Sequence, residues 1–403
     1  MNLTYEKIKD LSEKYGDDFF IFDKEKFVDN YNRLDKAFKK YYKKFRIGYS
    51  YKTNYAPHIC KVVDDLGGIA EVVSDMELEL SEMIGVSPVN VIYNGPSKSK
   101  SSLIKALSNG SIVNIDSMRD LHILLELADN NPEKKYGCVL RCNFELNTEH
   151  LSRFGFDTSG SDFSTAINTL KKLDNISLDG LHCHFPDRDL KSYVARIDKM
   201  LELVDKHFES PPKYLNIGGG FFSKMPEDMW DMFGGAPPTF DDYAEVIGGA
   251  LSKRYPGDDG PILFVEPGTA LVADTFTFIC KVISVKSVRG NNIATVQGSI
   301  FTISPTARNQ FLPVSLISNQ PYEKIDFDIA GFTCIEGDYL SKSVPFKINE
   351  GDFIRYDNVG SYSIVMKPPF ILPAPPVLQC EFGVFKVIKT RESNANVFER
   401  FVF

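Results

Sequence analysis

The sequence predicts a (β/α)8 barrel followed by a C-terminal antiparallel β domain. From about residue 45, short runs rich in β-branched and aromatic residues alternate with longer amphipathic runs, a pattern typical of parallel strands joined by helices. Eight strand candidates fall between residues 46 and 266, whereas a doubly wound sheet more often stops at five or six. After residue 270 the chain changes to β-type runs separated by turn residues, with little helical spacing.

The predicted elements follow in chain order. The eight barrel strands are expected at 46–52, 69–74, 89–94, 111–116, 137–144, 178–185, 213–217 and 262–266. Helical patterns lie between most neighbours, for example at 98–108 and 190–207. A strand at 17–27 precedes the barrel, and we expect it to pair with the C-terminal sheet, whose strand candidates are 273–288, 291–299, 324–331 and 351–364. The sequence therefore predicts an N-terminal strand segment over 1–28 that joins the β domain, a barrel over 29–270 and a β domain over 271–403.

Length, charge and cysteine content narrow the possible functions. The 403 residues carry 54 acidic and 46 basic side chains, so the formal charge of −8 gives no reason to expect a nucleic-acid or membrane-surface partner. The N-terminus lacks the apolar core of a signal peptide, and no later run approaches the roughly 20 apolar residues of a membrane span, so we expect a cytoplasmic protein. Seven cysteines without CxxC spacing argue against a disulfide framework and against a metal site.

Polar residues gather at the predicted carboxyl ends of the strands, where a barrel places its active site. Alone, each has an ordinary explanation, since a strand-terminal lysine is usually the first solvated residue and a glycine run is usually a tight turn. Together, a glycine run can bind phosphate, a lysine amine can form a Schiff base, and a carboxylate can keep a pyridine nitrogen protonated. These three functions describe pyridoxal 5'-phosphate (PLP). The residues are Lys52, Glu71, Ser74, Arg141, His182, His184, Gly218, Gly219, Gly220 and Glu266.

Seven ordered motifs resemble those of the fold type III PLP-dependent decarboxylases, the family that includes the diaminopimelate, ornithine and arginine decarboxylases. The resemblance spans nearly the whole chain. It implies the alanine racemase/ornithine decarboxylase-like fold, with a PLP-binding barrel, and a head-to-tail homodimer with active sites at the subunit interface. The motifs are YSYKTN (49–54), RFGF (153–156), GLHCHF (180–185), LNIGGGF (215–221), VEPG (265–268), GFTCIEGD (331–338) and NVGSY (358–362).

The resemblance also implies roles for individual residues. Lys52 would hold PLP as a Schiff base, and Cys334 would approach from the second subunit to protonate the quinonoid left after CO2 departs. Arg141 and Glu71 resemble supporting residues near the lysine. The residues implied to bind PLP itself are His184 against the ring, Glu266 at the pyridine nitrogen, and Gly218, Gly219, Gly220, Gly268 and Tyr362 at the phosphate.

Glu266 bears on the reaction type. A carboxylate keeps the pyridine nitrogen protonated, which makes the ring an effective electron sink for the carbanion left by CO2 loss. An alanine-racemase-like relative would be expected to place a basic residue there. Glu266 therefore favours decarboxylation over racemisation.

The chain departs from the family pattern at the positions expected to contact substrate. An acidic residue that receives the distal ammonium of ornithine or diaminopimelate is replaced by Ile335, next to Glu336. Arginines are replaced by Thr269 and Ser304, while a new Arg308 lies close by. A serine that usually touches the phosphate is replaced by Asp187, which we expect to point away, toward Arg188 or a substrate amine.

These departures disfavour a substrate with a free distal ammonium, because burying that charge without a carboxylate costs several kcal/mol. An amine capped as an amide fits better, and Arg308 suggests that an anionic group is also bound, although it has an ordinary explanation as a surface residue. In this respect the sequence resembles the decarboxylases of citrate-conjugated amino acids in carboxylate-siderophore biosynthesis, with N-citrylornithine as an example substrate. The alternatives are a decarboxylase of diaminopimelate or another free amino acid, and a non-catalytic PLP-binding regulatory homologue, against which Lys52, Cys334 and Glu266 argue.

Overall fold

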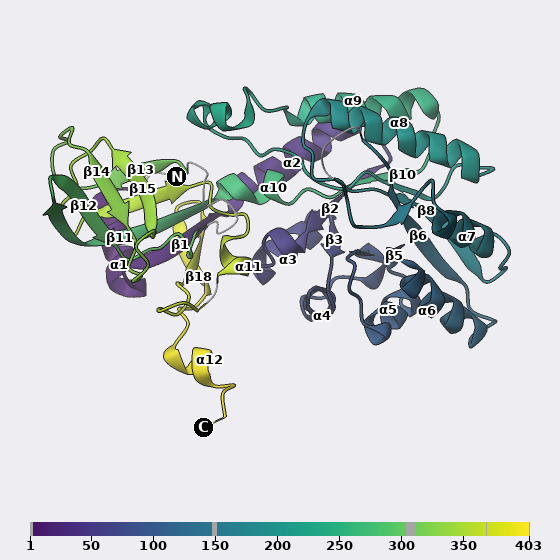
Figure 1. The fold of residues 1–403 in the computed structure, drawn as a ribbon, viewed down its shortest axis with the longest axis horizontal. Helices are drawn as coiled ribbons and strands as arrows, with labels where there is room; N and C mark the ends of the chain where they lie inside the picture. Colours follow the sequence, from purple (N-terminus) through teal and green to yellow (C-terminus); the bar gives the residue numbers. More distant parts are fainter. Residues whose placement is uncertain (1–2, 147–150, 304–311, 368, 403) are drawn as a thin grey trace. The chain divides into compact units, whose positions relative to one another are not determined.

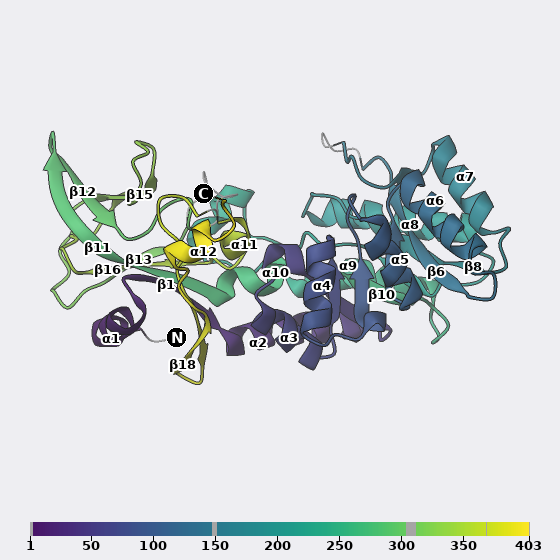
Figure 2. The same cartoon turned by 90° about the horizontal axis from the view of Figure 1, so that it is seen from below.

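The computed structural model describes residues 3–146, 151–303, 312–367 and 369–402. The chain forms two compact units, drawn in Figure 1 and Figure 2. We call one the barrel unit (Asn30–Phe222 and Pro237–Ala270) and the other the β unit (Met1–Asp29, Ser223–Ala236 and Leu271–Phe403). The segment Ser223–Ala236 thus groups with the β unit, although the sequence around it is barrel sequence.

The barrel unit contains eight parallel strands that close on themselves, because the last strand pairs with the first through Leu263 and Phe45. This closure confirms the predicted (β/α)8 barrel. The strands are β2 (Phe45–Ser50), β3 (Ile69–Val72), β4 (Val91–Tyr93), β5 (Ile112–Ile115), β6 (Tyr136–Asn143), β8 (Ile176–His182), β9 (Tyr214–Asn216) and β10 (Ile262–Val265). A two-residue strand, β7 (Phe156–Asp157), pairs with the end of β6.

One helix precedes the first barrel strand and the others follow strands, and most of them bury an apolar stripe. In α8 (Leu190–His207), the buried positions Tyr193, Ile197, Met200 and Val204 recur at helical spacing, and the Asp189 carboxylate caps the first turn by accepting from the Ser192 amide. The others are α2 (Lys24–Tyr41), α3 (Pro57–Asp65), α4 (Asp75–Met83), α5 (Lys100–Ser108), α6 (Met118–Asp129), α7 (Ser161–Leu170), α9 (Phe240–Arg254) and the short α10 (Thr269–Val272).

Strand register brings polar residues together at one end of this barrel. Pairing of β2 with β3 sets Ser50 beside Glu71, and pairing of β6 with β8 sets Arg141 beside His182. Because the carboxyl ends of parallel strands meet at the same rim, these side chains face a common space. Most of them are buried.

The β unit is mainly antiparallel. Its sheet runs in the order β15-β14-β12-β11-β1-β17-β18, with β16 pairing to β11 and β13. Two pairs, β1 with β17 and β12 with β14, are parallel within this mostly antiparallel sheet, which confirms the predicted antiparallel β domain. The strands are β1 (Asp18–Asp23), β11 (Phe276–Val288), β12 (Asn291–Val296), β13 (Val314–Ile317), β14 (Phe327–Ala330), β15 (Tyr339–Val344), β16 (Phe353–Asp357), β17 (Val377–Glu381) and β18 (Val384–Lys389).

The N-terminal strand pairs with this sheet, as the sequence predicts. β1 lies between β11 and β17, and its Phe19 and Ile21 pack with Ile8 and Leu11 of α1 (Tyr5–Tyr15). The predicted strand over 17–27 is too long, however. Residues from Lys24 onward are helical, because the Asp23 carboxylate accepts the Lys26 amide and starts α2.

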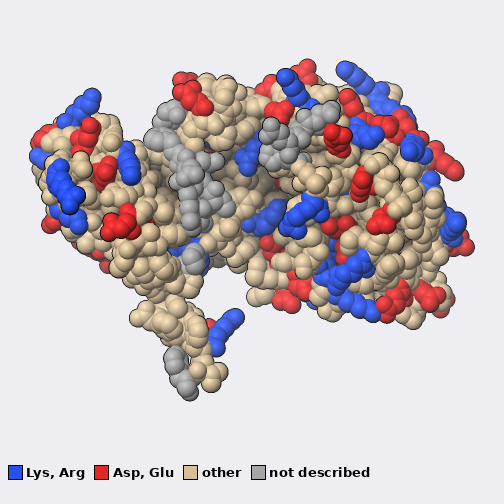
Figure 3. All heavy atoms as spheres, in the orientation of Figure 1, with Lys and Arg blue, Asp and Glu red and all other residues tan. Residues whose placement is uncertain are grey.

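Acidic and basic side chains are interspersed on the face drawn in Figure 3. Within the described residues, no helix is both long and apolar enough to cross a bilayer. All seven cysteines are free of disulfide bonds, and Cys334 is exposed while the other six are buried.

Candidate active site

Lys52 lies in a 3-10 turn (Tyr51–Thr53) that follows β2, so the prediction that the first strand ends on this lysine was wrong by two residues. The turn is anchored by Tyr49, whose hydroxyl donates to the Asn54 carbonyl at 2.9 Å. Lys52 Nζ contacts Glu71 Oε2 at 2.7 Å and Ser50 Oγ at 2.9 Å. About a third of the lysine side chain is exposed while Glu71 is fully buried, so the carboxylate holds the amine at the edge of the barrel interior.

A chain of hydrogen bonds links this lysine to Glu266, which directly follows β10. Asn94 Nδ2 donates to Glu71 Oε1 at 2.8 Å and to Glu266 Oε1 at 2.7 Å. Asn216 Nδ2, at the end of β9, donates to the same Glu266 oxygen at 2.7 Å. The structure therefore brings Lys52, Glu71 and Glu266 into one network, as their positions in the sequence predict.

Glu266 is held in its ionised form. Burial opposes ionisation, but the His182 imidazole, whose Nε2 lies 3.4 Å from Glu266 Oε2, and the Lys52 ammonium outweigh it and hold the pKa of Glu266 far below its usual range. Glu266 itself is only 4% exposed. The barrel thus contains a buried carboxylate that stays charged at neutral pH.

The three glycines after β9 form a tight loop. Gly218 and Gly220 have φ of +73° and +100°, a region that glycine adopts readily, and a Cβ on Gly219 would lie 2.1 Å from the Glu266 carbonyl. The Gly218 amide donates to Asn216 Oδ1 at 2.9 Å, and the Gly219 amide donates to His184 Nδ1 at 3.0 Å. No acceptor for the Gly220 amide is present among the described residues. Of the three glycines in this loop, Gly220 is therefore the one whose N–H is available for a phosphate oxygen.

His184 follows β8 and is neutral. Burial and the nearby Lys52 ammonium lower the pKa of this imidazole well below its ordinary value, and its Nδ1 acts as an acceptor. The side chain lies against the glycine loop, since a Cβ on Gly218 would come within 2.8 Å of it. Its stacking on a cofactor ring stays a prediction.

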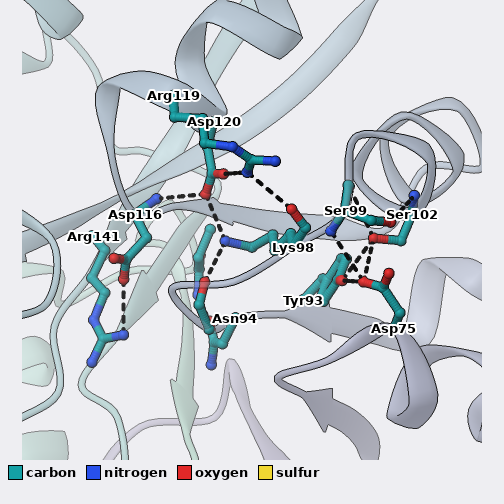
Figure 4. A network of polar contacts seen from close by, with 12 residues as sticks. Asp75, Tyr93, Asn94, Lys98, Ser99, Ser102, Asp116, Arg119, Asp120 and Arg141 are labelled. Carbon is teal, nitrogen blue, oxygen red and sulfur yellow. Dashed lines mark hydrogen bonds and ion pairs between the residues drawn. The ribbon is translucent and has the colours of Figure 1, made fainter.

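Arg141 belongs to a second charged network (Figure 4). Its Nη1 lies 3.0 Å from Asp116 Oδ1, and the Asp116 amide donates to Asp120 Oδ2 at 3.3 Å. Asp120 in turn pairs with Lys98 at 2.7 Å, and both side chains are at most 1% exposed. The ion pair with Asp116, itself held by the neighbouring Asp120–Lys98 pair, fixes the position of Arg141 on β6.

Gly268 and Thr269 follow Glu266. A Cβ on Gly268 would lie 2.0 Å from Thr53 Oγ1, so only glycine lets this segment pass beside the Lys52 turn. Thr269 is half-buried and begins α10. Both residues belong to the barrel unit.

The β unit carries the remaining predicted residues. Cys334, Ile335 and Glu336 lie exposed in the turn between Gly331 and Asp338, and Ile335 is 42% exposed. Tyr362 is half-buried with a φ of +60° just before α11 (Ser363–Met366). Ser304 and Arg308 lie outside the described residues.

Asp338 organises the turn that presents Cys334. Its carboxylate is 3% exposed and accepts from Ser299 Oγ at 3.1 Å, from the Ile300 amide at 2.9 Å and from Thr333 Oγ1 at 2.6 Å. A Cβ on Gly331 would lie 2.1 Å from this carboxylate. The carboxylate thus bonds to donors of its own turn and ties that turn to the segment at Ser299 and Ile300.

Several residues of the site were missed by sequence reasoning. Asn residues at strand ends read as turn formers, so their role as hydrogen-bond bridges was not expected. Their position could have revealed them, since each lies in the last two residues of a barrel strand or directly after one, at the same rim as Lys52. These residues are Ser50, Asn94, Asn114, Asp116 and Asn216. Within the described part of the chain, no cluster of three or more His, Cys, Asp or Glu side chains could hold a metal ion.

Comparison with known proteins identifies relatives for this arrangement. The family model described as "Pyridoxal-dependent decarboxylase, pyridoxal binding domain" matches residues 26–273, which is more than half of the chain. The diaminopimelate decarboxylase of Aquifex aeolicus is 25% identical, with 96% of this chain and 92% of the relative covered. That of Methanocaldococcus jannaschii is 26% identical over the same shares.

Solved structures agree on the fold. A crystal structure of diaminopimelate decarboxylase from M. jannaschii has a TM-score of 0.88 at 24% identity and covers 98% of this chain and 94% of its own. The arginine decarboxylase of Paramecium bursaria Chlorella virus has a TM-score of 0.75 at 20% identity, covering 91% and 97%. Both likenesses concern the fold, which combines a barrel with a β domain.

Proposed function

Because this chain belongs to the family of pyridoxal-dependent decarboxylases, we propose that it removes the α-carboxylate of an N-acylated diamino acid, such as N-citrylornithine in siderophore biosynthesis. The protein is a PLP-dependent carboxy-lyase of amino-acid metabolism. The substrate and the role of each residue are our proposal.

The barrel unit fits PLP. It offers an accessible lysine amine, an amide donor at Gly220 without an acceptor among the described residues, and a buried ionised carboxylate at Glu266. When bound, PLP supplies an electron sink that stabilises negative charge on the α-carbon of the substrate. We assign the aldehyde to Lys52, the pyridine nitrogen to Glu266 and the ring face to His184. The phosphate is assigned to the glycine loop, Gly268 and Tyr362.

Two side chains beside Lys52 can exchange a proton with its amine. Glu71 and Ser50 both contact Nζ, so the carboxylate can take up a proton when the amine is required as a nucleophile. Glu266 is ionised, and its negative charge would favour the protonated form of a pyridine nitrogen held beside it. Cys334 is exposed on its turn, and we propose that it donates a proton to the α-carbon in the partner subunit's site of a homodimer.

The observation that carries the substrate proposal is Ile335 beside Cys334. An apolar side chain occupies the position where the family pattern predicts an acid, and the acid of the same turn, Asp338, is fully used by hydrogen bonds. Glu336 is exposed. A free distal ammonium would lack a buried carboxylate at this position, which costs several kcal/mol, whereas an amide carries no charge.

Free diaminopimelate is the second candidate. Relatives named diaminopimelate decarboxylase align over 96% of this chain, which is the observation in its favour. Thr269 and Ile335 argue against it, since both replace charged residues of the family pattern.

A CO2-release assay decides between these substrates. Purified enzyme is offered N-citrylornithine, N-citryldiaminopropionate, diaminopimelate, ornithine, lysine and arginine, and kcat/KM is compared. We expect the citryl compounds to exceed the free amino acids by about a hundredfold, since an unpaired buried ammonium costs several kcal/mol. Faster turnover of diaminopimelate would refute the proposal.

Two variants test whether Ile335 determines the substrate preference. Ile335→Asp restores an acid and should shift the preference toward free ornithine by about tenfold. Ile325→Asp changes another partly exposed isoleucine of the β unit and should leave the preference unchanged. An equal effect of both substitutions would remove Ile335 from the substrate site.

A further inference from the structure

Arg196, in the second turn of α8, is fully buried. Its Nε donates to Ser192 Oγ at 3.1 Å, its Nη1 lies 3.5 Å from the Gly219 carbonyl oxygen, and its Nη2 donates to the Asp187 carbonyl. The guanidinium carbon lies 4.3 Å from the ring centroid of Tyr193 and 5.6 Å from that of Phe185. Each of these hydrogen-bond acceptors is neutral.

No carboxylate forms an ion pair with Arg196 among the residues that the structure describes. Arginine stays protonated in proteins, and a buried charge normally has a partner of opposite sign. Its contact with Ser192, four residues earlier, also draws the guanidinium toward the N-terminal end of α8, which already carries the positive end of the helix dipole. An anion bound near Arg196 would therefore be stabilised by both the guanidinium and the helix dipole.

The Gly219–Gly220 peptide connects Arg196 to the open side of the glycine loop. The Gly219 carbonyl accepts from Tyr193 Oη at 2.8 Å and faces Arg196, so it points toward α8. The described peptide bonds are trans, and in a trans peptide the N–H of the next residue points opposite to the carbonyl. The Gly220 N–H therefore points away from α8, and donors on the carbonyl polarise the amide and strengthen it as a donor.

We propose that Arg196 is a positioning residue for the phosphate of PLP. Through the Gly219 carbonyl it orients and polarises the Gly219–Gly220 peptide. It also supplies positive charge that stabilises a phosphate dianion. The proposal rests on the assignment of the glycine loop to the phosphate but is independent of the substrate. The same guanidinium also holds the Asp187 backbone carbonyl beside the glycine loop.

The test compares two ligands that differ only in the phosphate. Full-length protein stripped of cofactor is titrated with PLP and with pyridoxal, and Schiff-base absorbance gives both dissociation constants. Arg196→Met should weaken PLP binding by roughly tenfold to a hundredfold while pyridoxal binding changes by less than about twofold. Arg254→Met, at an exposed arginine of α9, is the matched control and should change neither constant.

Equal weakening of both ligands, or no weakening of PLP, would overturn the proposal, since a merely structural role would not distinguish them. If Arg196→Met does not fold, Arg196→Lys decides. The lysine keeps the charge but loses the planar set of donors, so PLP binding should weaken by only a few-fold and pyridoxal binding should not change. Failure of wild-type protein to bind PLP at all would instead contradict the proposed function.

Discussion

Glu266 carries a charge that its neighbours fix from three sides. Asn94 and Asn216 donate to one oxygen, and His182 faces the other. The His182 imidazole and the Lys52 ammonium outweigh burial and keep the pKa of this carboxyl far below its usual range, so its negative charge is available to a group that lies beside it. We therefore propose that the electron-sink chemistry depends on Glu266.

Glu266→Gln should retain the cofactor but lose most activity. A neutral amide cannot hold a proton on the pyridine nitrogen, so kcat should fall by about a hundredfold or more, while absorbance shows that PLP is still bound. Glu126→Gln, at an exposed glutamate, is the control. Unchanged kcat in Glu266→Gln would remove this residue from the chemistry.

Glu77 makes the stability of the fold depend on pH. It is 3% exposed at the start of α4, where its carboxylate accepts the Val73 amide at 2.8 Å, and burial together with nearby Glu71 raises its pKa from 4.5 to about 7. Since the folded-state pKa is the higher one, protonation stabilises the fold below pH 4.5, and this contribution is lost as the pH rises through 7.

Glu77→Gln should therefore be more stable than the wild type at pH 8 and lose that advantage toward pH 4.5. Glutamine keeps an acceptor for the Val73 amide without a buried charge. Melting temperatures across this range test the prediction, with Glu79→Gln, exposed on the same helix, as the control. A difference that does not vary with pH would contradict the raised pKa.

Some residues of the candidate site could be predicted from the sequence, and others could not. Lys52, Glu71, His184 and Glu266 stand out as a combination, because ionisable residues gather at the predicted carboxyl ends of several barrel strands. Asn94 and its neighbouring amides do not, because asparagine after a strand is ordinary turn chemistry. Their role depends on closure of the barrel, which brings strand ends far apart in the sequence to one rim.

At the scale of elements, the Gly331–Asp338 turn depends on one buried acid. Asp338→Ala would leave donors of Ser299, Ile300 and Thr333 without their acceptor, which should lower the free energy of unfolding by roughly 2–4 kcal/mol. Denaturant unfolding measures this, and Asp326→Ala at an exposed position is the control. An equal effect of the two substitutions would show that the turn does not need this carboxylate.

Strands of the barrel were predictable because each is a short apolar run followed by a helical pattern. α5 and α8 fall where their spacing predicts them. The first strand was predicted too long, since Tyr51 is buried like a strand residue but lies in a 3-10 turn. Four strands of the β unit were missed: β13, β15, β17 and β18. They are short, and segments such as YLSKSV carry polar residues whose strand geometry comes from pairing across the sheet.

At the scale of the whole molecule, the residues assigned to one active site are divided between the two units. Lys52 and Glu266 belong to the barrel unit, and Cys334 and Tyr362 to the β unit. The proposed homodimer joins Lys52 of one subunit to Cys334 of the other. Each subunit would then contribute to two sites.

Mixing two inactive variants tests this arrangement. Lys52→Ala should lack Schiff-base attachment, and Cys334→Ala should lack the proton donor, so each should be strongly impaired alone. If sites are shared, random exchange of subunits gives heterodimers with one intact site, and activity should recover to about a quarter of the wild-type value. No recovery after exchange would place both residues in sites formed by a single chain.

Borohydride reduction followed by peptide mass mapping tests whether Lys52 holds the cofactor. Reduction of the holoenzyme fixes a Schiff base as a stable amine, so the pyridoxyl group should appear on the peptide that contains Lys52, and the visible absorbance should disappear. A pyridoxyl group on another lysine, or none on any lysine of a protein that retains bound PLP, would show that Lys52 does not hold the cofactor.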